Sequence, residues 1–371
     1  MSFSVEQRCK LWLSTAEVTT DQLQPLTCQC ESAAGVWEAF AKDKERMFPQ
    51  AQVVSLERMH NEKEIDDYVN RLEKLKITVL FEESEDYPAL LREIDDPPYV
   101  LYCVGHLSAL QKPLISVIGT RRPSAYGKQM GRQIARGLAE AGVCVVSGLA
   151  YGIDACAHEG ALEGKGATVA VLGSGVNTPY PQENIPLLRS IIKGGGLAMS
   201  EFPLDAKPLP GHFPYRNRVI SGLSQALVFV EGKIKSGGMI TVASALAQGR
   251  EVFAVPGQAG TTGAEGPHTI LREGARLATS ARDILEDLGL LEEPSVISMA
   301  AQPGTETEGM ETSTSPVQRM ILEALKRESM TMDQLIIATG SRAEDLMPEL
   351  SVMEIMGQVR KDAGNLFSMV F

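Results

Sequence analysis

The sequence predicts an α/β protein whose central part is a Rossmann-like, doubly wound sheet of mainly parallel strands. From Pro113 onward, short runs of Val, Ile and Leu alternate with amphipathic segments long enough to be helices. Strands that are apolar throughout are typical of parallel sheets, which are buried on both faces. Four of the six expected strands end in Gly, Ser or Glu. Polar loops should therefore gather at the carboxyl edge of the sheet, where such folds bind ligands.

Six strands and four helices follow from this alternation. The expected strands are Ile115–Gly119, Val143–Ser147, Thr168–Leu172, Leu197–Glu201, Ala226–Glu231 and Glu251–Val255. The expected helices are Lys128–Ala141, Ile153–Glu163, Pro186–Lys193 and Met239–Gln248. Repeated strand–helix units imply right-handed crossovers with helices on both faces of the sheet.

The first 75 residues are expected to form a small helical domain, of the size of helix-hairpin-helix or SAM modules. Apolar residues recur at helical spacing around Trp12 and Trp37, and residues 62–75 form a charged amphipathic stretch. The glycine-bearing hairpin of a DNA-binding module is not evident, so a packing or partner role is favoured. Residues 76–112 carry turn sequences and are expected to lead into the core, residues 113–291.

The C-terminal part is expected to be a winged-helix domain, residues 316–371, joined by a flexible linker at residues 292–315. Three helical stretches, 317–326, 332–338 and 343–355, precede two short strands around a Gly-Asn turn. The third stretch carries four acidic residues and is flanked by Arg342. An acidic helix is a poor reader of the DNA major groove, so a partner or regulatory role is favoured.

The formal charge of −12 argues against a protein that binds nucleic acid by its overall charge. Positive charge would have to be concentrated locally. No apolar run reaches the roughly 18 residues that span a membrane, and the N-terminus lacks a secretory signal, so a cytoplasmic location is expected. The six cysteines include no Cys-x-x-Cys pair, and neither a disulfide framework nor a metal site is expected.

The first site candidate is the junction Gly119–Lys128, which follows the first strand of the core. Ser124 is placed to cap the next helix, whose N-terminus favours an anion. Arg121 and Arg122 would bind phosphate bidentately, and Lys128 adds charge. The segment matches neither a Walker loop nor G-x-G-x-x-G. The alternative interpretation is a pair of surface arginines that bridge to acidic residues.

The second candidate is the segment Lys207–Arg218, where aromatic and basic residues alternate. Rings stack on bases and guanidinium groups hold the backbone, so the pattern suits a single nucleic-acid strand. The residues concerned are Lys207, His212, Phe213, Arg216, Asn217 and Arg218. In the alternative interpretation the rings are core residues, and Arg216 or Arg218 pairs with Glu201 or Glu231.

The third candidate is Lys233–Met239, where Ser236 and Gly237 open a helix and present backbone N–H groups to an anion. Asp154 and His158 lie four residues apart at a helix start, with no nucleophile motif or metal-spaced partner. They are interpreted as structural, and no catalytic residue is expected.

Taken together, these motifs resemble the DNA-processing protein A (DprA/Smf) family. The matching segments are Gly119–Arg121 with Ser124 and Tyr126–Gly127; Ser147–Asp154 with Ala157–His158; Val171–Gly175 with Tyr180–Pro181 and Asn184; Ser200–Pro203; Phe213–Ser224; Val230–Glu231 with Ser236–Gly238; and Gly249–Val252 with Val255–Gly257. The match runs in order through roughly residues 77–289. The helical N-terminal region and the winged-helix tail also fit the family architecture.

The resemblance implies a homodimeric, non-enzymatic protein without cofactors. Such a protein binds single-stranded DNA, protects incoming DNA and helps load the RecA recombinase during natural transformation. By motif match, Arg121 belongs to a phosphate pocket and Phe213 is the base-stacking ring. Family members often carry a lysine three residues before that phenylalanine, where this chain has Pro210, so Lys207 would have to supply the contact. The implied dimer residues are His268, Leu271 and Leu277, and the implied recombinase contacts are Leu246 and Arg272.

Two other functions stay open at this point. A nucleoside-monophosphate phosphoribohydrolase would need two glutamates in the loop after Gly237-Gly238, but Ala243 and Ser244 stand there. A nucleotide-sensing regulatory module would use the same phosphate sites with a single pocket and no DNA. Affinity that stops rising after one nucleotide would distinguish the sensor from a strand-binding protein.

Overall fold

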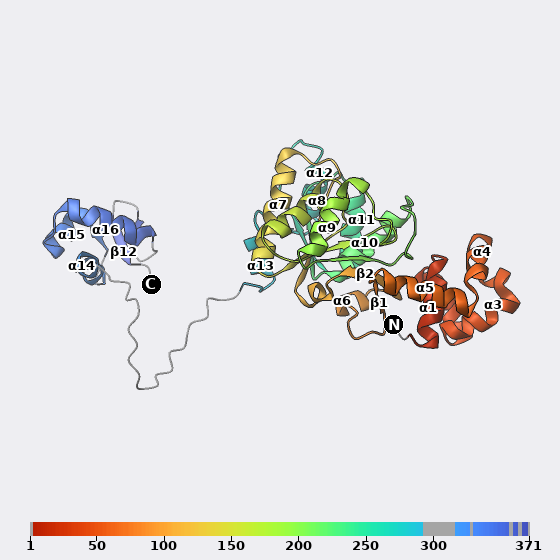
Figure 1. Cartoon of the computed structure of the whole chain (residues 1–371). Coiled ribbons are helices and arrows are strands. Elements are labelled where there is room, and N and C mark those ends of the chain that lie inside the picture. Colours follow the sequence, from red (N-terminus) through yellow and green to blue (C-terminus); the bar gives the residue numbers. More distant parts are fainter. Residues whose placement is uncertain (1–2, 292–315, 327–328, 356–358, 363–365, 370–371) are drawn as a thin grey trace, which may run out of the picture. The chain divides into compact units, whose positions relative to one another are not determined.

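The computed structural model describes residues 3–291, 316–326, 329–355, 359–362 and 366–369 (Figure 1). The chain divides into two compact units, the first ending at Ser295 and the second beginning at Val296. The expected linker, residues 292–315, lies outside the described residues.

The first unit is built on a nine-stranded sheet in the order β1-β2-β6-β5-β4-β3-β7-β8-β9. Seven strands, from β6 across to β9, are parallel, and β1 and β2 extend the sheet antiparallel at the β6 edge. The strands are β1 Thr78–Phe81, β2 Val100–Gly105, β3 Leu114–Ile118, β4 Cys144–Ser147, β5 Thr168–Val171, β6 Leu197–Ser200, β7 Ala226–Phe229, β8 Glu251–Ala254 and β9 Arg276–Leu277.

The strand order reverses at β3, which pairs with β4 on one side and with β7 on the other. From β3 the chain builds outward to β4, β5 and β6, and then returns to build β7, β8 and β9 on the opposite side. A reversal of this kind leaves a crevice at the carboxyl ends of the two central strands. The loops after β3 and β7 border that crevice.

Helices cover both faces of the sheet because alternate strand residues point to opposite sides. Ile118 and Phe229 pack in one core cluster with residues of α6, α10, α11 and α12. Val117 and Val228 pack in another with residues of α7, α8 and α13. The helices are α6 Ala89–Arg92, α7 Ala125–Glu140, α8 Ile153–Glu163, α9 Ile185–Lys193, α10 His212–Leu223, α11 Gly237–Ala247, α12 Glu265–Arg272 and α13 Ala281–Asp287, with short 3-10 turns at η1 Leu107–Gln111 and η2 Gln182–Asn184.

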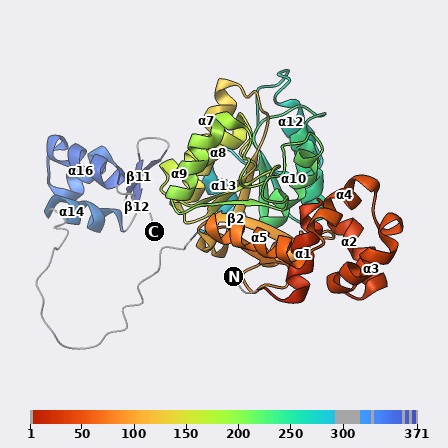
Figure 2. The ribbon, with the colours of Figure 1, turned by 45° about the vertical axis from the view of Figure 1, so that its right-hand side comes forward.

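Five helices precede the sheet: α1 Val5–Thr15, α2 Thr20–Cys30, α3 Ala33–Met47, α4 Gln50–Met59 and α5 Glu62–Lys74. Ser4 and Gln7 form a capping box at the start of α1, and Ser32 and Asn61 cap α3 and α5. These helices share a hydrophobic core with Phe81 and Tyr102 of the antiparallel strands. They gather beside the end of the sheet where β1 and β2 lie (Figures 1 and 2).

The second unit contains α14 Pro316–Leu325, α15 Met332–Thr339 and α16 Ala343–Ile355, with strands β10 Met330–Thr331, β11 Val359–Asp362 and β12 Leu366–Met369. The strands pair in the order β10-β12-β11, and Leu335, Leu350 and Phe367 lie in the core. Three helices and a small sheet make a winged helix. The expected Gly364-Asn365 turn lies outside the described residues.

The predicted fold class is confirmed, and the six expected core strands lie within two residues of the observed ones. Helices α10, α12 and α13 were not predicted from the sequence; α10 was overlooked because Lys207–Arg218 was interpreted as one continuous binding segment. Within the described ranges, no helix is both long and apolar enough to cross a bilayer.

Candidate nucleic-acid interface

A cleft of about 690 Å³ lies at the carboxyl edge of the sheet, at the reversal between β3 and β7. Three segments that are distant in sequence line most of it: residues 118–121 after β3, residues 208–220 around the start of α10, and residues 236–241 at the start of α11. They overlap in part with the three predicted segments, Gly119–Lys128, Lys207–Arg218 and Lys233–Met239. Ala150, Asp154 and Tyr180 line the rest.

Phe213 forms one wall of the cleft and is partly exposed. Its ring lies against the backbone of Gly173, where an added Cβ would come within 2.8 Å of the ring. The guanidinium of Arg121 lies 5.5 Å from the ring centroid, as in a cation–π contact. Arg121 is exposed and forms no ion pair with a described residue. An aromatic face and a free positive charge therefore meet at one point.

The N-terminus of α7, predicted to bind an external anion, already holds one. The carboxylate of Glu231 accepts hydrogen bonds from the Ser124 backbone N–H, at 3.1 and 3.2 Å, and from the Ser124 hydroxyl, at 2.9 Å. Gly127 allows this approach, because a Cβ there would lie 1.8 Å from Glu231 Oε2. Ser124 also accepts from the Gly127 N–H as the helix cap. Its polar atoms are thus engaged within the protein.

The N-terminus of α11 is open. Ser236 is its N-cap residue, but its hydroxyl caps no backbone group, and this buried oxygen has no partner among the described residues. Gly237 and Gly238 follow in the first turn, where helix N–H groups have no acceptor inside the helix. All three residues line the cleft. Among the described residues, the N-terminus of α11 is therefore without the side-chain anion that occupies the N-terminus of α7.

Arg216 lies at the floor of the cleft, with only 3% of its surface exposed. Its guanidinium donates to the carbonyl oxygen of Gly148 at 3.0 Å and to that of Val171. Burial lowers the pKa of Arg216 to about 10. Asp154 accepts from the Gly148 and Ala150 N–H groups, at 3.2 and 3.4 Å. Burial raises its pKa, and the charge of Arg216 opposes that rise. The pair ties together the ends of β4 and β5.

His158 lies behind this floor and is fully buried. Its Nδ1 lies 2.7 Å from the Thr168 hydroxyl oxygen, and burial lowers its pKa to about 3. A neutral, enclosed imidazole fits the structural role given to it in the sequence analysis. In the part of the chain that the structure describes, no group of three or more His, Cys, Asp or Glu side chains is arranged to hold a metal ion.

Arg218 and His212 face away from the cleft. Arg218 is buried, with its guanidinium 2.6 Å from Glu201 and 2.7 Å from Asp96. The pairing with Glu201 is the alternative that the sequence left open. The His212 ring stacks on Phe202 at 4.0 Å, and its Nε2 lies 3.2 Å from the Glu17 carboxylate.

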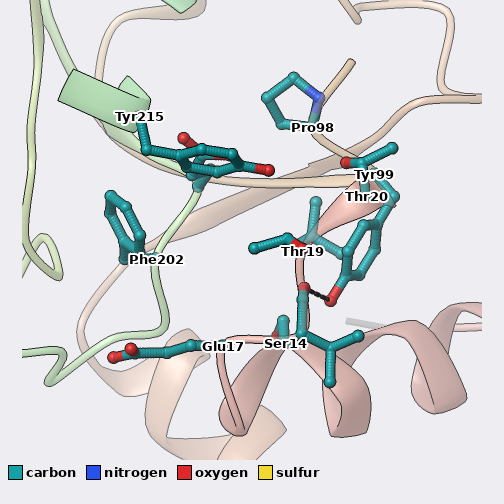
Figure 3. Close-up of a pocket in the computed structure, with 11 residues that line it drawn as sticks. Ser14, Glu17, Thr19, Thr20, Pro98, Tyr99, Phe202 and Tyr215 are labelled. Atoms are coloured by element: carbon teal, nitrogen blue, oxygen red, sulfur yellow. Dashed lines mark hydrogen bonds between the residues drawn. The ribbon is translucent and has the colours of Figure 1, made fainter. Parts of the chain in front are cut away.

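These contacts lie beside a second, small cavity between α10 and the N-terminal helices. It measures about 20 Å³, room for one water molecule. Figure 3 shows Phe202 and Tyr215 on one side of it and Glu17, Thr20 and Tyr99 on the other. The hydroxyl of Tyr99 donates to the Val18 carbonyl at 2.8 Å. This side of α10 therefore holds the N-terminal helices against the sheet.

Of the remaining predicted contacts, Asn217 lines the cleft, whereas Lys207, Arg122 and Lys128 are not among its lining residues. The Asn217 amide donates to the Gly237 carbonyl at 3.4 Å. Lys207, Arg122 and Lys128 are exposed, and none forms an ion pair with a described residue. Pro210, which stands where the family often has a lysine, is on the cleft wall. Tyr180 also lines the cleft but was not among the predicted contacts, although its Tyr-Pro motif contributes to the family resemblance.

The residues implied in dimer and recombinase contacts gather toward the β9 edge of the sheet. Leu277 lies on β9, the last strand, and is 53% exposed. His268 and Leu271 are on α12, and His268 Nε2 lies 3.0 Å from the Gly257 carbonyl oxygen. Leu246 is 57% exposed near the end of α11, and Arg272 is exposed at the end of α12.

Two family models match this chain. The family described as DNA recombination-mediator protein A matches residues 78–289, and the DprA winged helix domain matches residues 305–365. The chain is 47% identical over 206 residues to the protein Smf of Escherichia coli, a match that covers 56% of this chain and 55% of that protein. It is 35% identical over 309 residues to the protein Smf of Synechocystis, with 76% and 77% covered.

Solved structures agree with these matches. DNA processing protein A (DprA) of Streptococcus pneumoniae aligns with a TM-score of 0.65 and 31% identity, over 77% of this chain and 99% of that one. DNA processing protein A of Helicobacter pylori, which has been studied for its single-stranded DNA binding mode, aligns with a TM-score of 0.52 and 31% identity. That alignment covers 57% of this chain and 95% of the other.

Proposed function

Because the chain belongs to the DprA (Smf) family of DNA recombination mediators, we propose that it binds single-stranded DNA in the cleft at the carboxyl edge of its sheet. One observation carries this proposal: a free arginine, an exposed ring and an open helix N-terminus line the same cleft. A strand needs backbone anions held and bases stacked, and these are the groups that do both.

In this assignment the α11 N-terminus and Arg121 hold phosphate groups, and Phe213 receives a base. The contacts are the same for every base, because phosphates are identical and all bases have an aromatic face. The relative from Helicobacter pylori is a single-strand binder, which supports the same ligand here. The exposed residues Arg122, Lys128 and Lys207 add charge along the path of the backbone.

Four of the residues predicted as contacts are left out of the proposed interface. Ser124, His212, Arg216 and Arg218 each make internal contacts that use their polar groups. For the buried residues Arg216 and Arg218, breaking these contacts to reach DNA would cost several kcal/mol.

The test is a titration of oligonucleotides of rising length with the wild type and with Arg121→Ala, repeated at several salt concentrations. We expect weaker binding by Arg121→Ala and a shallower salt dependence, since each phosphate contact contributes about 0.7 to the slope for single strands. Arg189→Ala is the matched control, because Arg189 is exposed on α9, outside the cleft, and forms no ion pair with a described residue. Equal slopes for the wild type and Arg121→Ala would contradict the phosphate role.

We further propose that two copies act together and deliver DNA to a RecA-type recombinase. Two weak sites on one strand bind more tightly than either alone, which suits a chain of net charge −12. His268, Leu271 and Leu277 would form the dimer contact, and Leu246 and Arg272 the recombinase contact. Leu277→Arg should give monomers in sedimentation and weaken binding to long oligonucleotides. Leu246→Ala should leave DNA binding intact and lower recombinase loading, measured by filament assembly on coated DNA.

One observation favours a second function, the sensing of a free nucleotide. Since Glu231 occupies the α7 N-terminus, only one of the two helix N-termini predicted to bind phosphate, that of α11, is left open, as a mononucleotide site would need. Comparing thymidine monophosphate with longer oligonucleotides separates the two functions. Affinity that rises with the length of the oligonucleotide supports strand binding. Affinity for the mononucleotide that equals the affinity for longer oligonucleotides supports the sensor.

A further inference from the structure

Tyr180 is an exposed aromatic residue on the rim of the cleft, in the loop between β5 and α9. It is 39% exposed, and its ring centroid lies 5.7 Å from that of Phe213, with an angle of 57° between the two planes. The two rings are therefore neighbours but are not stacked on each other. Both line the same cleft.

The loop that carries Tyr180 is held in place by contacts on both sides of the ring. Upstream, the Gly175 N–H donates to the Ala206 carbonyl at 2.9 Å, and the Asn177 amide donates to Asp205 at 2.7 Å. Downstream, Asn184 donates to the carbonyls of Leu149 and Ala150, at 2.9 and 3.2 Å. The ring is thus positioned in advance, so a base that binds it loses little conformational entropy of the loop.

The other two exposed tyrosines of the described residues have evident structural roles. The Tyr126 hydroxyl donates to the Pro256 carbonyl at 2.8 Å, and the Tyr151 hydroxyl donates to Glu183 at 2.5 Å. The Tyr180 hydroxyl has no hydrogen-bond partner among the described residues. A large exposed ring that is held in place but forms no hydrogen bond contributes little to the stability of the fold. Its position beside Phe213 makes it available for contact with a ligand in the cleft.

We propose that Tyr180 is a second base-binding residue, so that each cleft takes two consecutive nucleotides, one on Phe213 and the next on Tyr180. This assignment rests on the proposed binding of single-stranded DNA. The rings are 5.7 Å apart, whereas stacked nucleotides rise by about 3.4 Å each. The strand therefore binds in an extended conformation, in which each base stacks on a protein ring instead of on the neighbouring base.

The test compares thymidine mono-, di- and trinucleotides with a 5′-phosphate on the wild type, Tyr180→Ala and Tyr180→Phe. The wild type should gain affinity from one to two nucleotides. Tyr180→Ala should bind the mononucleotide normally and lose most of that gain, by about 5- to 150-fold, the range for one stacked base. Tyr180→Phe should keep it, because stacking uses the ring and not the hydroxyl. Salt dependence should not change, since no phosphate contact is removed.

Tyr126→Ala is the matched control, as an exposed tyrosine outside the cleft lining whose hydroxyl donates to Pro256 and not to the Tyr180 loop, and it should bind every oligonucleotide like the wild type. Dinucleotide binding by Tyr180→Ala at wild-type strength would overturn the second subsite. An equal loss for the mononucleotide would also overturn it, because it would place Tyr180 in the first subsite. Arg121→Ala and Phe213→Ala are titrated alongside. If these two variants also bind like the wild type, the proposal that the cleft binds single-stranded DNA is wrong. If only Tyr180→Ala binds like the wild type, only the proposal of a second base-binding residue is wrong.

Discussion

Helix α10 carries an aromatic residue on each of two sides, and the two sides serve opposite purposes. Phe213, Asn217 and Ile220 face the cleft, where polar and aromatic groups lie open. His212 and Tyr215 face the N-terminal helices, whereas Arg218 faces Asp96 and Glu201, and each of the three side chains is stacked or paired. The first set has the spacing i, i+4, i+7 and the second i, i+3, i+6, so helical periodicity separates them. Charge and aromaticity in a sequence therefore indicate a binding site only once the face is known.

The largest loss of stability should come from removing the ion pairs of Arg218. Arg218→Ala leaves Glu201 and Asp96 without their shared cation, and we expect the free energy of unfolding to fall by about 3–5 kcal/mol, measured by urea denaturation. Arg121→Ala on the open side should change it by less than about 0.5 kcal/mol. The comparison fails if Arg218→Ala is as stable as Arg121→Ala, or if it weakens DNA binding while still folded.

Next in size is the loss of the open ring. Phe213→Ala should lower affinity for a single-stranded oligonucleotide by the free energy of one stacked base, about 1–3 kcal/mol, with the salt slope unchanged. Fluorescence anisotropy at two salt concentrations measures both quantities. Phe213→Tyr is the conservative control and should restore binding. A change in the salt slope would mean that Phe213 acts through Arg121, which lies 5.5 Å from the ring.

The paired side should also show a pH dependence through Glu201. Burial raises its pKa to about 7, against the charge of Arg218, whereas the ordinary pKa of a glutamate is 4.5. The folded protein therefore holds this proton more tightly than the unfolded chain. The stabilisation is complete below pH 4.5 and is lost as the pH rises through 7, by at most about 1.4 kcal/mol per pH unit.

Urea denaturation from pH 4.5 to 8 measures this effect as the difference between the wild type and Glu201→Gln. The difference is needed because His158, whose pKa burial lowers to about 3, acts in the opposite direction below pH 6.5. Identical pH profiles for the two proteins would refute the assignment to Glu201.

The smallest effect is expected at Ser124, which lies between the open cleft and residues that are paired within the protein. Its hydroxyl donates to Glu231 and accepts from the Gly127 N–H as the cap of α7. Ser124→Ala should lower the free energy of unfolding by about 1 kcal/mol, the usual loss for a helix cap, and leave DNA affinity unchanged. A matched loss of affinity in the same protein would show that the α7 N-terminus reaches the strand after all.

Much of this molecule was predictable from local pattern. Alternating apolar strands and amphipathic segments gave the doubly wound sheet, and the strand ends placed Gly119, Phe213 and Ser236 near one edge. The α10 helix was predictable too, because residues 213, 216, 217 and 220 show helical spacing. The mixture of basic and aromatic residues in that segment concealed the pattern.

The sequence by itself determined the fold class, the winged helix and the three segments that meet at the carboxyl edge, because these follow from hydrophobic periodicity and short motifs. Only the tertiary structure decided which charges are free. Glu231 reaches Ser124 across 107 residues of sequence, and Asp96 reaches Arg218 across more than a hundred. Whether a charge is paired depends on what the fold brings within about 4 Å of it, and local sequence carries no record of that distance.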